Sequence, residues 1–176
     1  LARAHDQLTN KTWDSTPFRE LVNTELEAYI GLDSGRVQCD CPEVLLTPFA
    51  FSTLALVIHE LTTNSVKYGC LSNDTGVLML SGQKADNGDL IFNWKETGGP
   101  VVQAPTRSGF GSTVIERSIP FELKGEANVR FEVNGLEAAM RIPAEFVEFA
   151  EREVTAAEAA IESKEEAKHQ FEEWLN

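Results

Sequence analysis

The sequence predicts an α+β fold, a two-layer α/β sandwich in which helices lie on one face of a mixed, mostly antiparallel sheet. Apolar residues recur with helical period in several segments, and short alternating or β-branched runs lie between them. Two Asn-Gly pairs, Asn87-Gly88 and Asn134-Gly135, separate such runs, and this dipeptide is the strongest short signal for a hairpin. Helices that segregate from antiparallel strands are typical of this fold class.

The composition excludes some classes of partner. The chain has 176 residues, 42% of them hydrophobic, which is enough for one globular core. Its formal net charge is −13, and a surface of that sign repels nucleic acid and anionic lipid. We therefore expect neither as a partner. An anionic ligand such as a nucleotide would need a locally positive pocket or a bridging cation.

Three cysteines, Cys39, Cys41 and Cys70, form no regular framework, which fits a reducing compartment and a cytoplasmic location. No apolar run approaches the ~18 residues of a membrane span, and no signal peptide is visible. The chain begins in the middle of a helical pattern and without a methionine. We therefore expect it to be a piece of a longer protein.

The N-terminal part predicts a helix end, a helix and a strand. Residues 1–13 have the pattern of the last turns of a helix. Residues 15–17, Ser-Thr-Pro, combine a hydroxyl cap with proline, which predicts a helix start, and the helical period continues to Gly31. Residues 36–40 predict a strand, and residues 43–46 a short extended piece.

A second cap-plus-proline pair, Thr47-Pro48, predicts the start of a helix over residues 48–68. Gly69 follows it and is predicted to end it in the left-handed conformation. This helix contains the most informative stretch of the chain, because an apolar run precedes a compact group of polar side chains.

The second half predicts two hairpins and one further helix. The hairpins pair residues 76–84 with 90–96 and residues 128–133 with 136–142. Between them a helix is predicted from Ser112 to about Ser118, stopping before Pro120.

The composition changes at Phe146. Residues 146–176 are rich in glutamate and alanine and contain neither glycine nor proline, which predicts an acidic C-terminal helix. Its apolar positions do not form a sustained heptad, so a docked or protruding helix is favoured over a coiled-coil linker.

Three polar residues of the 48–68 helix share one face. Glu60, Asn64 and Lys67 stand at i, i+4 and i+7. An asparagine carbonyl oxygen is a ligand that Mg²⁺ accepts, and Mg²⁺ in turn bridges phosphates. An acid, an amide and a cation on one face therefore suit a metal–phosphate site better than a plain solvated surface.

Two glycine-containing segments fit the same purpose. Glu96 ends a strand and is followed by Gly98, so a carboxylate lies beside backbone that a flat base can approach closely. Gly109 and Gly111 precede a helix, whose free N–H groups could face phosphate oxygens. A carboxylate can accept a hydrogen bond from an exocyclic amine, which distinguishes adenine from guanine. Together with the polar helix face, these segments describe an ATP site.

These motifs resemble a known family. Residues 59–69 (HELTTNSVKYG), Trp94-Lys95-Glu96, Gly98-Gly99-Pro100 and Gly109-Phe110-Gly111 look like the catalytic and ATP-binding domain of the HWE subfamily of bacterial sensor histidine kinases. The residues that name the subfamily match His59, Trp94 and Glu96. The resemblance covers roughly residues 1–143, and the wider superfamily includes gyrase-like and MutL-like ATPases. It implies the nucleotide-binding fold that these proteins share.

The resemblance also implies roles for individual residues. Asn64 would coordinate Mg²⁺, Glu60 would orient water or the metal shell, and Lys67 would contact phosphate. Glu96 would hold the adenine amine. The further nucleotide contacts that the resemblance implies are His59, Tyr68, Gly98, Gly109, Phe110 and Gly111.

The resemblance implies two partners. The γ-phosphoryl group of ATP would move to a histidine on the protein's own dimerisation hairpin, and a response regulator would act downstream. Residues 1–13 would be the end of that hairpin, residues 14–145 the catalytic domain and residues 146–176 the acidic helix. His5 belongs to the hairpin tail and is not expected to be the acceptor, which would therefore lie outside this chain.

Several alternatives remain open at the level of sequence. His59 could be a core histidine bonded to the backbone, Trp94 could serve packing, and Lys67 could be a solvated cation. The whole domain could be a degenerate docking or phosphotransfer module that binds no nucleotide, although the intact glycines and Asn64 argue against it. It could also be a stand-alone ATPase of the wider superfamily.

Overall fold

The computed structural model describes residues 15–31, 34–101 and 110–150. Its main sheet has five strands in the order β2-β4-β5-β7-β6. The only parallel pair in this sheet is β2 with β4. The strands are β2 (Val37–Asp40), β4 (Val77–Lys84), β5 (Leu90–Thr97), β6 (Glu126–Glu132) and β7 (Gly135–Ile142). The prediction of a mixed, mostly antiparallel sheet is confirmed.

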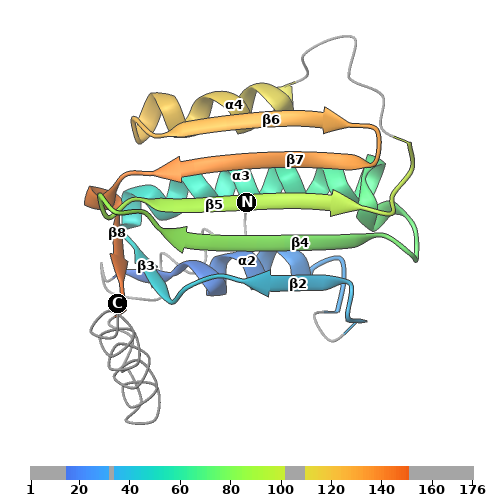
Figure 1. Ribbon diagram of the computed structural model, residues 1–176, viewed down its shortest axis with the longest axis horizontal. Helices are drawn as coiled ribbons and strands as arrows, with labels where there is room; N and C mark the ends of the chain where they lie inside the picture. Colours follow the sequence, from blue (N-terminus) through green and yellow to red (C-terminus); the bar gives the residue numbers. More distant parts are fainter. Residues whose placement is uncertain (1–14, 32–33, 102–109, 151–176) are drawn as a thin grey trace, which may run out of the picture.

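The helices of the described chain lie on one face of this sheet (Figure 1). They are α2 (Phe18–Glu27), α3 (Pro48–Tyr68) and α4 (Phe110–Glu122). Because the buried side chains of α2 and α3 join those of the strands in one apolar cluster, the core lies between the two layers. In the described ranges no helix combines the length and the apolar character needed to cross a membrane.

Helix α3 has the predicted bounds, and its predicted start is confirmed. The Thr47 hydroxyl accepts a hydrogen bond from the Ala50 N–H at 3.3 Å, and Pro48 occupies the first turn. The side that faces the sheet is apolar and fully buried at Leu54, Ile58 and Leu61. This packing fixes the rotation of α3 and therefore decides which residues its outer face presents.

A second, three-stranded sheet was not predicted. It consists of β1 (Thr16–Pro17), β3 (Val44–Leu46) and β8 (Val147–Phe149), all antiparallel. Thr16 pairs with Leu46, so the predicted helix cap at residues 15–17 is wrong. Helix α2 begins only at Phe18, without a side-chain cap, and it ends at Glu27 rather than at Gly31. Pairing with β3 decides this outcome, because proline's fixed φ suits an extended edge residue as well as a first helical turn.

The predicted C-terminal helix does not begin at Phe146. A short 3₁₀ turn, η3 (Ala144–Phe146), leads into β8. In β8, Val147 pairs with Leu46, and its side chain packs on the core. Backbone pairing and apolar burial therefore override the local helix propensity at this point. The remainder of the predicted helix, residues 151–176, lies outside the described residues.

Gly69 does not adopt the predicted left-handed conformation. Its backbone is extended, with φ −103° and ψ −153°. A Cβ atom at this position would lie 2.0 Å from Glu96 Oε2. Glycine is therefore needed here for a close approach to a side chain of β5 and not for a positive φ.

Helix α4 does not stop before Pro120 but continues to Glu122. Pro120 cannot donate to the carbonyl four residues earlier, but both it and Glu116 are exposed, so water can satisfy that carbonyl. Ile119, beside the proline, and Leu123, just after the helix, are fully buried in the core. Their burial explains why the helical path is kept through the proline.

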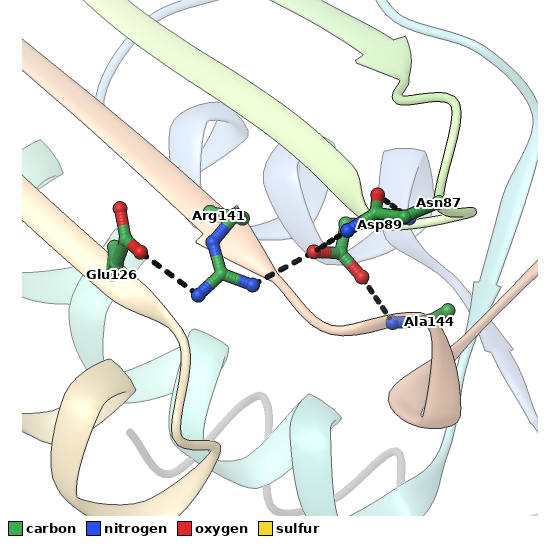
Figure 2. Close-up of polar contacts among 5 residues, drawn as sticks. All are labelled: Asn87, Asp89, Glu126, Arg141 and Ala144. Carbon is green, nitrogen blue, oxygen red and sulfur yellow. Dashed lines mark hydrogen bonds and ion pairs between the residues drawn. The ribbon is translucent and has the colours of Figure 1, made fainter.

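An ion-pair network joins the first hairpin to the end of β7 (Figure 2). Buried Asp89 accepts hydrogen bonds from Arg141 Nη1 at 2.7 Å, from the Ala144 N–H at 2.9 Å and from Asn87 Nδ2 at 2.9 Å. Arg141 also donates to Glu126 at 2.9 Å. The guanidinium of Arg141 is the main cause that holds the pKa of the Asp89 carboxyl below its ordinary value.

Candidate functional site

Three polar side chains lie along one face of α3. Glu60 and Asn64 are half-buried and Lys67 is exposed. In the part of the chain that the structure describes, their side chains make no hydrogen bond or ion pair with protein groups. The carboxylate, the amide and the ammonium group are therefore available to a ligand. Their spacing places them on one face, as the sequence predicts.

His59 is paired with a buried carboxylate from another helix. Its Nδ1 lies 2.9 Å from Oε2 of Glu25 on α2. Glu25 is only 5% exposed, and its other oxygen, Oε1, has no partner among the described groups. This contact holds α2 against α3 directly beside Glu60. Sequence reasoning did not assign a role to Glu25, although a glutamate on the otherwise apolar face of α2 was a usable signal.

Glu96 is buried at the end of β5 and is bonded through both oxygens. The Trp94 indole Nε1 donates to Oε1 at 3.0 Å, and the Cys70 N–H donates to Oε2 at 2.9 Å. Trp94 and Glu96 point to the same face because they are two residues apart on a strand. Trp94 therefore both packs in the core and holds the carboxylate. An ionised carboxylate has lone pairs beyond these two bonds, so it can accept a further donor.

The segment between α3 and β4 is fixed against the turn after β5. It includes a 3₁₀ turn, η2 (Cys70–Ser72). Arg36 donates to the carbonyl oxygens of Cys70, Asn73 and Gly76, and Asn73 Nδ2 donates to the Gly98 carbonyl at 3.0 Å. Sequence reasoning did not single out Arg36. Its fork geometry allows one side chain to hold several carbonyl groups at once.

Gly98 has a positive φ of +70°, which favours glycine. A Cβ atom there would lie 3.3 Å from the backbone of Gly76, so the two loops approach closely. Tyr68, at the end of α3, is 73% exposed. Phe110 and Gly111 form the first turn of α4, and Gly109 lies outside the described residues.

The predicted site segments lie at one end of the sheet. In Figure 1 the end of β5 and the C-terminal end of α3 lie at the right-hand side, and α4 starts somewhat right of the middle. Helices α3 and α4 pack against each other, and Glu96 bonds directly to the residue that begins η2. The fold therefore places the strand-end carboxylate of Glu96 beside the segment that follows α3, and α4 packs on the same helix. Hard oxygen donors beside a lysine fit a phosphate chain with a bridging Mg²⁺.

No family model matches the chain. The blue-light-activated histidine kinases of Brucella anthropi and Brucella ovis are each 33% identical to it over 139 residues, which is 77% of this chain. The chain spans 28% of the length of these relatives.

Solved structures share its fold. The histidine kinase domain of the Erythrobacter litoralis EL346 blue-light activated histidine kinase covers 79% of this chain and 68% of its own, with a TM-score of 0.59 and 17% identity. The catalytic domain of histidine kinase ThkA covers 76% and 98%, with a TM-score of 0.54 and 13% identity. The fold is that of histidine kinase catalytic domains, and the relatives that match 77% of the chain are named histidine kinases, which supports the resemblance to HWE-type sensor histidine kinases.

Proposed function

We propose that this chain is the ATP-binding catalytic domain of a sensor histidine kinase. In this proposal it transfers the γ-phosphoryl group of ATP to a histidine on the dimerisation hairpin of its own protein. The observation that carries the proposal is the α3 face on which Glu60, Asn64 and Lys67 have no partner among the described protein groups. A ligand that carries phosphate and a divalent cation would supply partners for the amide, the carboxylate and the ammonium group together.

The three polar residues of α3 would each have a different role in binding Mg²⁺ and phosphate. Asn64 would give its carbonyl oxygen to Mg²⁺, which neutralises developing charge on the phosphates when it is bound. Glu60 would orient a water of the metal shell, and Lys67 would contact a phosphate oxygen. Catalysis by such residues is mainly positioning and charge neutralisation, because the protein forms no covalent bond to the phosphoryl group.

The residues at the end of β5 would give the site its specificity for adenine. The Glu96 carboxylate, oriented by Trp94 and by the Cys70 N–H, would accept a hydrogen bond from the adenine amine. Gly98 would leave room for the ring, and Tyr68 and His59 would lie near the nucleotide. The backbone at Gly109, Phe110 and Gly111 would face the phosphates. A cytoplasmic location follows from the use of ATP, and a response regulator would receive the phosphoryl group next.

A transfer assay tests this function. The full-length protein that carries this domain is incubated with labelled Mg-ATP, and acid-labile, base-stable phosphohistidine is measured. The proposal expects phosphohistidine in the wild type and none in the Asn64→Ala variant. Asn93→Ala is the matched control, because Asn93 lies on the opposite face of β5 and bonds only to Ser81 among the described side chains.

Two other outcomes would contradict the proposal. Steady release of phosphate by the isolated domain, lost in Glu60→Ala, without phosphohistidine in the full-length protein would indicate a stand-alone ATPase. A folded chain that neither binds Mg-ATP nor forms phosphohistidine would indicate a docking module.

A further inference from the structure

Two cysteines lie together at a place remote from the nucleotide site. Cys39 belongs to β2, an edge strand of the main sheet, and Cys41 follows that strand. Cys39 is half-buried and Cys41 buried, whereas Gln38 and Asp40 between and beside them are exposed. Both cysteine side chains therefore point to the face of the sheet that α2 covers. Both are free thiols.

A guanidinium group is fixed over this pair. Arg19 Nη1 donates to Cys39 Sγ at 3.6 Å, Nη2 donates to the Cys41 carbonyl oxygen at 2.7 Å, and Nε donates to Glu43 at 2.9 Å. Because the two oxygen acceptors hold the guanidinium in place, the third contact brings a permanent positive charge to the sulfur of Cys39. A cation at this distance stabilises a thiolate relative to a thiol.

Taken together, the other groups around the sulfur also stabilise the thiolate of Cys39. The Cys41 thiol hydrogen-bonds to Cys39 and is the largest cause that lowers the pKa of the Cys39 thiol, to about 7. Burial and the negative charge of Asp40 act in the opposite direction, and Arg19 acts in the same direction as Cys41. Glu43 lies on the far side of Arg19 and is exposed. The contact with Arg19 and the hydrogen bond from Cys41 therefore favour the thiolate form of Cys39 over the thiol.

The remaining cysteines provide a contrast within the same chain. Cys70 is 1% exposed, and burial raises the pKa of its thiol to about 11. The pKa of the Cys41 thiol is raised, chiefly because it donates its proton toward Cys39. Only Cys39 combines exposure with thiolate character, which are the two conditions for a reactive cysteine.

We propose that Cys39 is a site of reversible covalent modification by low-molecular-weight disulfides, held reactive by Arg19 and Cys41. In the reaction, the Cys39 thiolate attacks one sulfur of the small disulfide. A new S–S bond forms to that sulfur while the old S–S bond breaks, and the other half leaves as a thiolate that takes up a proton from water. A thiol reductant reverses the reaction by the same exchange. This inference is independent of the proposed nucleotide function.

The experiment follows the reaction of the folded full chain with dithiodipyridine, a neutral small disulfide whose release product absorbs light. The proposal expects one fast-reacting thiol, with a rate that rises through pH about 7. The fast phase is lost in Cys39→Ser and kept in Cys70→Ser. Mass spectrometry of the reacted chain should find the adduct on Cys39, and dithiothreitol should remove it.

Variants of the two neighbours test the cause of the reactivity. Cys41→Ser keeps a hydrogen-bond donor and should keep the midpoint of the rate profile, whereas Cys41→Ala removes the donor and should raise it toward ~8.5, the value of a free thiol. Arg19→Gln should raise the midpoint as well, and Arg19→Lys less. If the Arg19 variants do not fold, the two Cys41 variants still show whether a neighbouring hydrogen-bond donor causes the reactivity of Cys39.

Three results would overturn the proposal. The fast phase could survive in Cys39→Ser. Its midpoint in the wild type could lie near ~8.5, as for an unperturbed thiol. Finally, Cys39 in the folded chain could react at pH ~6 no faster than the same cysteine in the urea-unfolded chain, which has ordinary thiols.

Discussion

Glu25 is the residue whose role depends most on tertiary contacts. It shares a face of α2 with Phe18, Leu21 and Val22, all almost fully buried, and it ends beside His59. The helical period places it toward the core, but nothing local names its partner, which is 34 residues away. Similarly, the sequence identifies Trp94 and Glu96 as candidate site residues, and only the fold shows that the Trp94 indole donates a hydrogen bond to Glu96.

The Glu25–His59 contact predicts energetic coupling between two helices. Glu25→Ala and His59→Ala should each lower the free energy of unfolding, because each removes this contact and His59→Ala also takes a hydrogen-bond partner from the buried Glu25 carboxylate. The double variant should be more stable than the sum of the two losses predicts, by ~1 kcal/mol or more, as expected for residues in contact. Urea unfolding of the four proteins measures this coupling.

Exposed Glu27, two residues further along α2, gives the matched control. Glu27→Ala combined with His59→Ala should be additive within ~0.5 kcal/mol. Additivity of the Glu25 and His59 variants as well would show that the contact contributes nothing to stability in solution.

At the scale of elements, short-range signals predicted α3 and the hairpins, but they failed where pairing or packing with distant segments decides the conformation, as at residues 15–17, Gly69 and Phe146. The Thr47-Pro48 start of α3 and the Asn87-Gly88 turn, where Gly88 has φ +86°, depend on neighbours in sequence. The strands β1 and β8 exist because both pair with β3. Pairing between segments this far apart leaves no periodic signal in a two- or three-residue strand, so no reading of local pattern could have found it.

Gly69 predicts a sharp substitution effect at the junction of α3 and η2. In Gly69→Ala the new Cβ would meet Glu96 Oε2 at 2.0 Å and the Ser65 backbone at 2.9 Å. The resulting shift should lower the free energy of unfolding by ~1–3 kcal/mol, the usual range for overpacking. Because Glu96 must move, affinity for ATP should fall too. Thermal unfolding and calorimetric titration measure the two effects.

Gly31→Ala serves as the control for Gly69→Ala. Apart from its chain neighbours, no heavy atom of the described residues lies within 4 Å of the Cβ position at Gly31, so this variant should neither be destabilised nor lose nucleotide affinity. Equal behaviour of the two alanine variants would contradict the close packing described for Gly69.

The Asp89–Arg141 network predicts a pH-dependent contribution to stability. The lowered pKa of Asp89 means that the folded chain favours its ionised form. This contribution is fully present above the ordinary carboxyl pKa and is lost as pH falls through the lower pKa of the folded state. Asp89→Asn should therefore lower the free energy of unfolding at pH ~7 by on the order of 2 kcal/mol, and the difference from wild type should shrink below pH ~4.

Urea unfolding at several pH values checks this expectation. Glu126→Gln is the control, because the Glu126 side chain is 75% exposed and its ion pair with Arg141 is screened by water. A difference between wild type and Asp89→Asn that stays constant from neutral to acidic pH would show that the charge of Asp89 is not the cause.

At the scale of the whole molecule, the fold class was predictable because it depends on element type and order. The helices and the hairpins each had a local signal, and their arrangement in two layers follows from burying their apolar faces. The assembled site depends on contacts between distant segments, such as Arg36 with the loop that ends at Gly76. Glu60, Asn64 and Lys67 were predictable because a helix fixes their spacing without any tertiary contact.

The net charge of −13 opposes the binding of an anion at the proposed nucleotide site. Lys67 is the cation of the α3 face, and a divalent ion at Asn64 would supply the remaining positive charge. We therefore expect the affinity for nucleotide to depend strongly on the metal.

Calorimetric titration of the folded chain with ATP, in the presence of Mg²⁺ and in the presence of a chelator, tests this claim most directly. With Mg²⁺, the wild type should bind one ATP saturably, and its affinity should fall greatly when the chelator is present. The Asn64→Ala variant should bind ATP equally weakly in both conditions. No binding to the folded wild type, or binding of wild type that does not change when Mg²⁺ is removed, would contradict it.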